Sequence, residues 1–196
     1  IYLVADQFFF IYRKPKLDYN IEKWERGRKR MELPVKLKEK GFDICKVETE
    51  DLEDFIRVER ESHYQYVAMH KDFFGEWNET ILQNSFIDKM HMKYFKKLEW
   101  NGENVGFLGY DLKEHMIDNV FIRIIPKAQK NGIGTWFLNE LKELSEQMSM
   151  PVFLTVIQTN PARYVYQKME FQCYKKQDVF EFYRYDPLGG RREKHE

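Results

Sequence analysis

The sequence predicts an α/β (α+β) fold, in which a mixed sheet is covered by helices. Residues 120–147 change from an aliphatic, β-branched run to a helical repeat of apolar residues, which is typical of a strand followed by a helix. Asn101-Gly102, the preferred pair for a tight hairpin, separates two strand-like runs. The apolar run 151–157 precedes a helix that opens on a proline. Strands and helices that follow one another in this way favour a sheet with helical layers.

The elements are expected in the order β-α-α-β-β-β-α-β-α-β-β. Thr49 and Asn78 are the expected N-caps of the first two helices, because both side chains can accept a backbone N–H. The aromatic segment between these helices is expected to be a loop, and 151–157 is expected to be buried on both faces. The expected strands are 42–47, 95–100, 104–110, 116–125, 151–157, 171–174 and 179–185, and the expected apolar helix faces are Leu52, Phe55 and Ile56; Leu82, Phe86 and Met90; Ile133, Trp136, Phe137, Leu141 and Leu144; and Ala162, Val165, Tyr166 and Met169.

Composition divides the chain into three parts. Residues 1–40 are expected to form an N-terminal extension, with a strand and a short basic helix, that packs on the body or on a second subunit. Residues 41–186 form the expected main domain, and residues 187–196 form a charged, mobile tail.

The same composition disfavours several functional classes. Basic and acidic residues number 32 each, so no net charge favours binding to nucleic acid or to an acidic membrane. No apolar run approaches the roughly 18 residues that a membrane helix needs. Cys45 and Cys173 have neither disulfide-scaffold nor metal-ligand spacing. We therefore expect a cytoplasmic protein without nucleic-acid or membrane partners, for which a homodimer is one expected assembly.

The segment Gln129–Gly134, with the sequence QKNGIG, is the first candidate binding site. It lies between the predicted strand and the start of the predicted helix, where backbone N–H groups lack intrahelical partners and the helix dipole adds positive charge. Its glycines allow a ligand to approach the backbone closely. The segment lacks the third glycine of a dinucleotide fingerprint and the Lys-Ser/Thr pair of a P-loop. It nevertheless suits a phosphate or a diphosphate.

A second motif, Asn160–Phe171, has the sequence NPARYVYQKMEF. Together, the Q-x-x-G-x-G loop and this N-P-A-R-x-x-Y segment resemble the two motifs of the GNAT N-acyltransferase superfamily, in the family's order. The second motif departs from the family's pattern at Glu170, where glycine is usual. The resemblance covers residues 42–185, leaves residues 1–40 outside, and implies a mostly antiparallel central sheet flanked by helices.

The resemblance implies acetyl-CoA as the cofactor. The pyrophosphate is expected on the amides of the loop, and the pantetheine arm is expected to pair like an extra strand with Ile122 and Ile124, where the two central strands splay apart. Lys130 could add charge near a phosphate; the alternative is a solvated lysine. The cofactor-binding residues that the resemblance implies are Ile122, Ile124, Gln129, Lys130, Asn131, Gly132, Ile133, Gly134, Thr135, Asn160 and Arg163.

Acylation of an amine needs a base for the amine and an acid for the leaving thiolate. Tyr166 matches the family's helix tyrosine, which protonates the departing sulfur; the alternative is that it packs on its helix. Asp118 occupies the strand position at which some members carry a glutamate base, and the alternative is a solvated carboxylate at a strand end. Glu59, Glu61 and Glu76 are weaker candidates for the base.

Four aromatic residues occupy the segment that lines the acceptor cleft in the family, and their alternative role is core packing. They are Tyr64, Tyr66, Phe74 and Trp77. The histidines show no metal-ligand spacing, so no metal is expected.

The expected function is direct transfer of an acetyl group from acetyl-CoA to a primary amine of a small molecule or a protein. One alternative is a non-catalytic module of the same fold that binds or senses acyl-CoA. Another is a different nucleotide in the Gln129–Gly134 loop.

Overall fold

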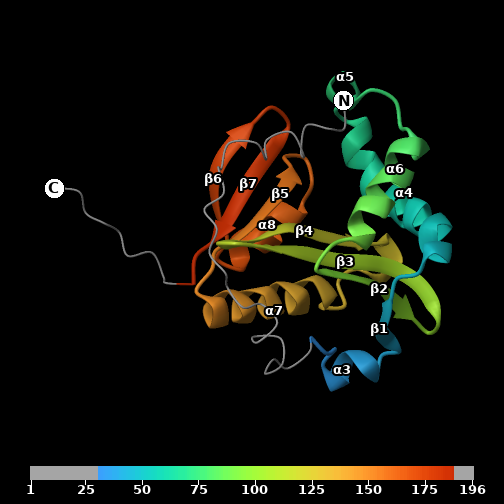
Figure 1. Ribbon diagram of the computed structural model, residues 1–196. Helices are drawn as coiled ribbons and strands as arrows, with labels where there is room; N and C mark the ends of the chain where they lie inside the picture. Colours follow the sequence, from blue (N-terminus) through green and yellow to red (C-terminus); the bar gives the residue numbers. More distant parts are fainter. Residues whose placement is uncertain (1–30, 188–196) are drawn as a thin grey trace.

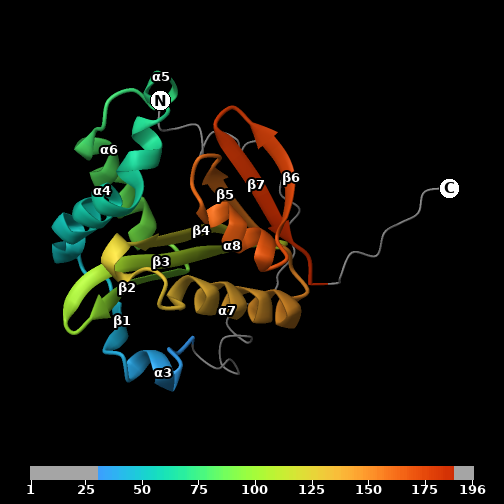
Figure 2. The ribbon, with the colours of Figure 1, turned by 180° about the vertical axis from the view of Figure 1, so that it is seen from behind.

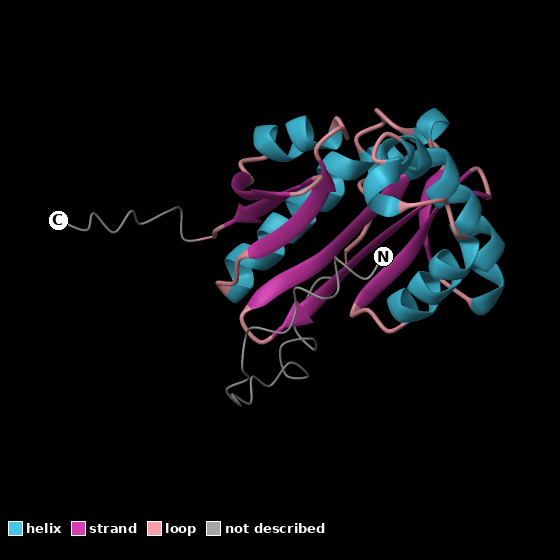
Figure 3. Ribbon diagram, turned by 90° about the horizontal axis from the view of Figure 1, so that it is seen from above, coloured by secondary structure: helices cyan, strands magenta, loops and turns pink. Residues whose placement is uncertain are grey.

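A computed structural model of the chain describes residues 31–187. Within this range the strands form one seven-stranded sheet in the order β1-β2-β3-β4-β5-β7-β6. The central neighbours β4 and β5 run parallel, and the other neighbouring strands run antiparallel. Helices cover both faces of the sheet (Figures 1 and 3). The predicted mixed, mostly antiparallel sheet is therefore confirmed.

The first half of the sheet contains β1 (Phe42–Lys46), β2 (Tyr94–Trp100), β3 (Glu103–Lys113) and β4 (Met116–Ile124). The β2–β3 turn is the Asn101-Gly102 pair, with φ angles of 51° and 81°. Both angles are left-handed, as a type I′ hairpin requires, which confirms the predicted hairpin.

The second half contains β5 (Val152–Ile157), β6 (Gln172–Gln177) and β7 (Phe180–Tyr185). The expectation that β5 is buried on both faces is wrong at Thr155, which is exposed. Helix α5 packs on Ile157 and Phe180, at the carboxyl end of β5, and leaves Thr155 uncovered.

One face of the first half carries α4 (Leu52–Ala68) and α6 (Glu79–Met90), with the short α5 (Lys71–Phe74) between them. Phe55 of α4 packs on Phe107 of β3 and Phe121 of β4, at ring-centroid distances of 5.4 and 5.9 Å. The Asn78 cap is confirmed, because its side chain accepts the Thr80 N–H at 2.9 Å.

Two expectations for this face are wrong. Glu48, rather than Thr49, caps the first helical segment: Glu48 and Asp51 form a capping box around a short 3-10 helix, Thr49–Asp51. A carboxylate at each end of this turn satisfies two backbone N–H groups at once. The segment with Tyr64 and Tyr66 is helical rather than a loop, because α4 meets no glycine or proline before Gly75.

The opposite face carries α7 (Ile133–Met148) and α8 (Ala162–Lys168), as Figures 1 and 2 show for α7. The predicted apolar face of α7 is confirmed, since Ile133, Phe137, Leu141 and Leu144 are buried. Val165 of α8 is 40% exposed, so its predicted burial is wrong. The short α8 packs through Ala162, Tyr166 and Met169, and Val165 lies outside that stripe.

Residues 31–40 contain the short helix α3 (Val35–Lys38). Met31, Leu33 and Leu37 are buried in the same core cluster as the sheet residues, and Trp100 Nε1 donates to the Lys40 carbonyl at 2.9 Å. This part of the expected extension thus packs on the body. The strand and basic helix predicted before Met31, and the tail from residue 188, lie outside the described residues.

Candidate active site

The two central strands part soon after they begin. Within residues 31–187, β4 and β5 have one register pair, Ile117↔Val152, beside which the Ile117 N–H donates to the Pro151 carbonyl at 2.9 Å. A bulge follows: Asn119 adopts φ 51°, and the β3–β4 register shifts between Asp111↔Asp118 and Gly109↔Phe121. Bulges increase local strand twist. The rest of β4, with Ile122 and Ile124, therefore presents an edge that β5 does not pair.

This open edge leads into the loop before α7. Pro126–Ala128 form a 3-10 turn, Lys130 adopts φ 62°, and Gly132 adopts φ 93° as the residue that caps α7. No backbone N–H of residues 130–135 donates to another described residue. A Cβ added at Gly132 or at Gly134 would meet no atom within 4 Å. The loop therefore offers free amides and open space to a ligand, at a helix N-terminus that favours anions.

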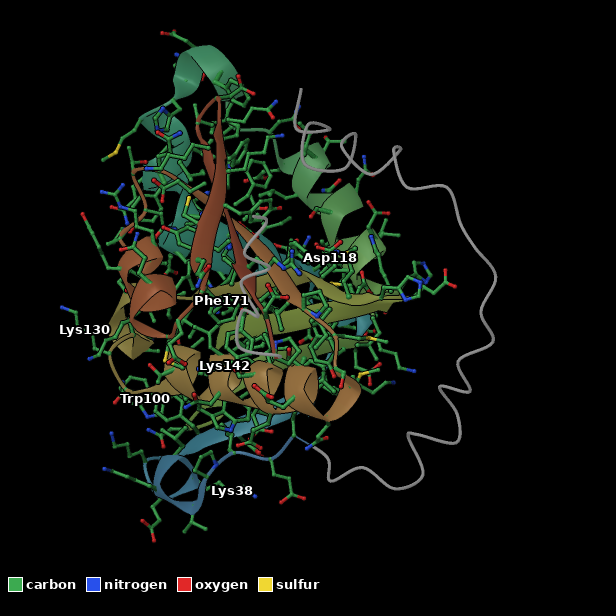
Figure 4. All side chains as sticks on the ribbon, turned by 90° about the vertical axis from the view of Figure 1, so that its left-hand side faces the viewer. Lys38, Trp100, Asp118, Lys130, Lys142 and Phe171 are labelled. Atoms are coloured by element: carbon green, nitrogen blue, oxygen red, sulfur yellow. The ribbon has the colours of Figure 1, made fainter. Side chains whose placement is uncertain are left out.

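Two side chains of the loop hold its shape. Gln129 Nε2 donates to the Ile124 carbonyl at 2.8 Å, and Asn131 Nδ2 donates to the Ala128 carbonyl at 3.1 Å. These contacts tie the loop to the end of β4, so a ligand meets the loop's backbone rather than these two amides. Figure 4 shows Lys130 at this end of the molecule, away from Asp118. The free amides and the vacant positions beside both glycines fit a diphosphate.

Tyr166 lies on α8, on the face of the sheet that α7 covers. Its ring packs between Phe171 and Tyr183, at centroid distances of 6.4 and 5.8 Å. Its hydroxyl makes no hydrogen bond to the described residues. Burial raises the pKa of Tyr166, and the positive charge of Arg123 opposes this effect. The phenol is thus protonated at neutral pH and free to donate a proton.

A buried polar network holds α8 to the sheet. Gln167 Nε2 donates to the Tyr183 hydroxyl at 2.9 Å, and that hydroxyl donates to Glu181 at 2.7 Å. Glu181 also pairs with Lys176 at 2.7 Å and with Arg163 at 3.7 Å. Burial, together with the hydrogen bond to Glu181, raises the pKa of Tyr183 to about 12. The network fixes the helix that carries Tyr166.

The two residues of the second motif that the resemblance assigns to the cofactor have partners within the protein. Asn160 Oδ1 accepts the Ala162 N–H at 2.9 Å, which is a cap contact for α8. Arg163 Nη2 donates to the Tyr164 hydroxyl at 2.8 Å. Their binding roles stay predictions.

Glu170 departs from the family's glycine and keeps a glycine-like backbone, with φ 69°. A left-handed conformation costs a non-glycine residue about 1–2 kcal/mol. The Glu170 carboxylate pairs with Lys142 of α7, and this contact lowers the Glu170 pKa. The ion pair joins α8 to α7 and offsets part of the strain.

The opposite face of the open edge carries charged residues that the sequence patterns did not single out as a group. Arg123 of β4 donates from Nε to Glu59 Oε2 of α4 at 3.1 Å, and Glu59 is buried. His63 lies one turn further along α4, and its Nδ1 is enclosed without a hydrogen-bond partner. The signal that could have revealed this group is Arg123, a charge inside an aliphatic strand.

Asp118 precedes the bulge and lies at the amino end of β4 (Figure 4). Its carboxylate is 3.4 Å from Lys113 Nζ and accepts the Asn119 N–H at 2.7 Å. About 16 Å of strand separates it from Arg123, although both side chains point to the α4 face. The structure thus brings Glu59, rather than Asp118, to the group around Arg123.

The other candidate residues are spread over the α4–α5 region. Phe74 is buried against Phe180, in a small cluster that also contains Tyr66, so both contribute to core packing. Tyr64 and Trp77 stack edge to face at 5.2 Å on a more exposed surface. Glu61 pairs with Arg57 at 3.4 Å and Glu76 pairs with Lys71 at 2.5 Å, both at the surface.

Residues 31–187 contain no group of three or more His, Cys, Asp or Glu side chains that could hold a metal ion. None of the helices in this range has the length and apolar character needed to cross a membrane.

Comparison with solved structures places this fold among acetyltransferases. The PaiA N-acetyltransferase of Thermoplasma acidophilum, solved with coenzyme A, matches at a TM-score of 0.58 and 17% identity, over 74% of this chain and 98% of that one. The ribosomal-protein-S18-alanine N-acetyltransferase of Escherichia coli matches at a TM-score of 0.54 and 19% identity, over 77% of this chain and 97% of that one. Salmonella typhimurium yncA, solved with acetyl-CoA, matches at a TM-score of 0.51 and 12% identity, over 77% of this chain and 96% of that one. At these identities the likeness shows the fold.

A sequence comparison with curated proteins finds no match. The family model of the acetyltransferase (GNAT) domain, in contrast, matches residues 58–187, which include β4, the loop before α7 and α8. Families of this domain use acetyl-CoA as acyl donor, and the open β4 edge and free loop amides fit that cofactor. The chain therefore belongs to the GNAT acetyltransferase family, and it is an acyl-CoA-dependent transferase.

Proposed function

We propose that this acetyltransferase transfers the acetyl group directly from acetyl-CoA to a primary amine of a small molecule or a protein. The observation that supports this most is the continuity of the open β4 edge with the free amides of residues 130–135. An extended pantetheine arm can pair with an unpaired strand edge, and a diphosphate suits a helix N-terminus. Acetyl-CoA supplies the acetyl group as an activated thioester.

In this proposal Tyr166 protonates the thiolate that leaves. It is the one protonatable hydroxyl of α8 that packs toward the sheet without a hydrogen-bond partner in the described range. Replacement of Tyr166 by Phe removes the proton donor and preserves the ring packing on Tyr183 and Phe171. We expect kcat to fall by roughly 100-fold or more, as for other general acids, with little change in stability.

The proposal is tested first by calorimetric titration with acetyl-CoA, with ATP and NAD as controls. We expect micromolar binding of acetyl-CoA and little of either control. A folded sample that does not bind acetyl-CoA refutes the proposal, and preferential binding of ATP or NAD supports the other-nucleotide alternative. Binding without turnover on a broad amine panel supports the acyl-CoA sensor.

The catalytic base, the cellular location, the assembly state and the partners are proposed as the sequence suggested them. Asp118 stays the candidate base that the resemblance suggested, and Asp118→Asn tests this candidate by its effect on kcat at constant acetyl-CoA affinity, alongside the alternative base argued below. A cytoplasmic location, a homodimer, and the lack of nucleic-acid and membrane partners stay predictions; light scattering of the purified protein checks the dimer.

A further inference from the structure

Titratable side chains from both faces of the sheet gather around Arg123, beside the edge that β5 leaves open. Glu59 and His63 approach from α4, one helical turn apart, and Glu59 bonds Arg123 Nε at 3.1 Å. Tyr166 lies on the opposite face, which α7 covers. Its ring packs on Tyr183 of β7. Tyr185 points to the same face as Tyr183, and its hydroxyl donates to Glu146 of α7 at 2.6 Å. Arg123 belongs to the part of β4 that β5 does not pair, so the groups beside it on the α4 face lie next to the open edge.

Glu59 is poorly suited to accept a proton from a substrate. Its Oε2 atom already accepts from Arg123, and the pair is largely removed from solvent, with side-chain exposures of 6% for Glu59 and 23% for Arg123. Protonation of Glu59 would leave Arg123 as an unbalanced, partly buried charge, which is costly. The pair is better understood as a fixed neutral unit that orders this part of the site.

His63 has the free proton-accepting capacity that Glu59 lacks. Its Nδ1 is enclosed and its ring packs near Tyr66 at 6.1 Å, whereas Nε2 is neither enclosed nor hydrogen-bonded to a described residue. Burial, and then the charge of Arg123, keep the His63 pKa well below its ordinary value. The titratable and charged groups beside it are Glu59 and Tyr66 of α4 and Arg123 of β4. The imidazole is therefore neutral around pH 7 with one lone pair available, and as a weak base it passes any proton that it accepts on to solvent.

We propose that His63, through Nε2, is the base that receives the proton of the attacking amine, on the side of the sheet opposite to the acid Tyr166. This inference rests on the proposed function. The amine nitrogen forms a C–N bond with the acetyl carbon as its N–H proton passes to His63, and the C–S bond breaks as the thiolate takes the proton of Tyr166. Solvent then removes the proton from His63 and restores that of Tyr166, so atoms and charge balance.

A spectroscopic experiment tests this placement without requiring turnover. The full chain is labelled with ¹⁵N at its histidine rings, saturated with coenzyme A and titrated with n-butylamine as a generic primary amine. We expect the His63 Nε2 resonance, assigned through His63→Gln, to shift, and that of His70, which lies 3.3 Å from Thr159 Oγ1, to stay in place. A protein that binds coenzyme A but leaves the His63 resonance unchanged at saturating n-butylamine overturns the proposal.

A kinetic experiment on the same amine gives an independent test. For His63→Gln we expect kcat/KM for n-butylamine to fall 100- to 10,000-fold, as for loss of a general base, while the acetyl-CoA affinity stays within about twofold. His70→Gln, the matched control on the same side of the molecule, retains wild-type values. Full activity of a folded His63→Gln protein overturns the proposal, and loss of activity in Asp118→Asn then assigns the base to Asp118. Failure to bind coenzyme A at all refutes the proposed function instead, and this inference with it.

Discussion

Replacement of Gly106 by Ala is expected to lower the stability of the protein by an amount that the packing around this residue allows us to estimate. Gly106 lies on β3 opposite Ile124 of β4, and a Cβ placed there would come 2.4 Å from the Arg123 carbonyl oxygen and 3.3 Å from the Ile124 Cα. Both contacts involve backbone, so no rotation of a side chain can relieve them. Gly106→Ala must therefore push β3 and β4 apart at the end of their ladder, next to the pairs Phe107↔Arg123 and Leu108↔Ile122.

The expected cost follows from the overlap. Ordinary Cβ contacts begin near 3.4 Å, so the Arg123 carbonyl would have to retreat by about 1 Å. Overpacking of this kind costs about 1–3 kcal/mol, and we expect the upper part of that range because both groups are backbone. For a chain of this size such a loss lowers Tm by roughly 5–10 °C.

Urea unfolding followed by tryptophan fluorescence measures this loss. Gly109→Ala is the matched control on the same strand: its Cβ would meet the Tyr94 carbonyl oxygen at 3.0 Å and the mobile end of the Met92 side chain at 3.1 Å. We expect about 1 kcal/mol there, because the methionine can move. A Gly106→Ala protein within about 0.5 kcal/mol of wild type would show that the β3–β4 register is incorrect. Because Ile124 is displaced, acetyl-CoA affinity is also expected to fall in this variant and not in Gly109→Ala.

Three further predictions concern the loop, the α8 network and the buried histidine. Gly132→Ala places a side chain at φ 93°, so it is expected to lower the free energy of unfolding by about 1–2 kcal/mol and to weaken acetyl-CoA binding. Gly134→Ala, inside α7 with open space around it, is expected to raise the free energy of unfolding by up to about 1 kcal/mol. Urea unfolding and calorimetric titration of both variants check this difference. Burial raises the pKa of Glu181, but Lys176 and Tyr183 lower it overall, so Glu181 contributes stability above its ordinary pKa of 4.5 and loses it as pH falls through the folded pKa. Glu181→Gln is expected to reduce this loss of stability at acid pH. A Glu181→Gln protein that loses as much stability at acid pH as the wild type would contradict the prediction. His63 is protonated near pH 6.5 in the unfolded chain and only at lower pH in the folded chain, so the wild-type protein loses stability as the pH drops below about 6.5. His63→Gln is expected to lose less stability than the wild type between pH 7 and 5. Thermal unfolding in a pH series measures this difference.

The sequence alone was sufficient for the parts of this protein that depend on local chemistry. The Asn101-Gly102 hairpin, the Asn78 cap and the apolar stripe of α7 follow from turn geometry, capping and helical periodicity, which act over a few residues. The QKNGIG loop was recognisable for the same reason, since a strand, two glycines and a helix start are adjacent in the chain. Errors arose where local signals competed: Thr49 and Glu48 can both cap a helix, and the capping box with Asp51 decides for Glu48.

Only the tertiary structure decided which side chains share the site. Whether β4 has a neighbour beyond Ile117 depends on how β5 and β7 pack, and no pattern within β4 records this. The pairing of Glu59 with Arg123, the enclosure of His63 and the position of Tyr166 across the sheet join segments that lie far apart in the chain. Asp118 occupies the expected strand position, yet the bulge at Asn119 and the Lys113 contact set its surroundings. Local preferences determine elements over a few residues, whereas charge and burial at a site depend on contacts between distant segments. The sequence therefore specified the candidate binding loop, and only the fold decided which charged side chains lie near one another.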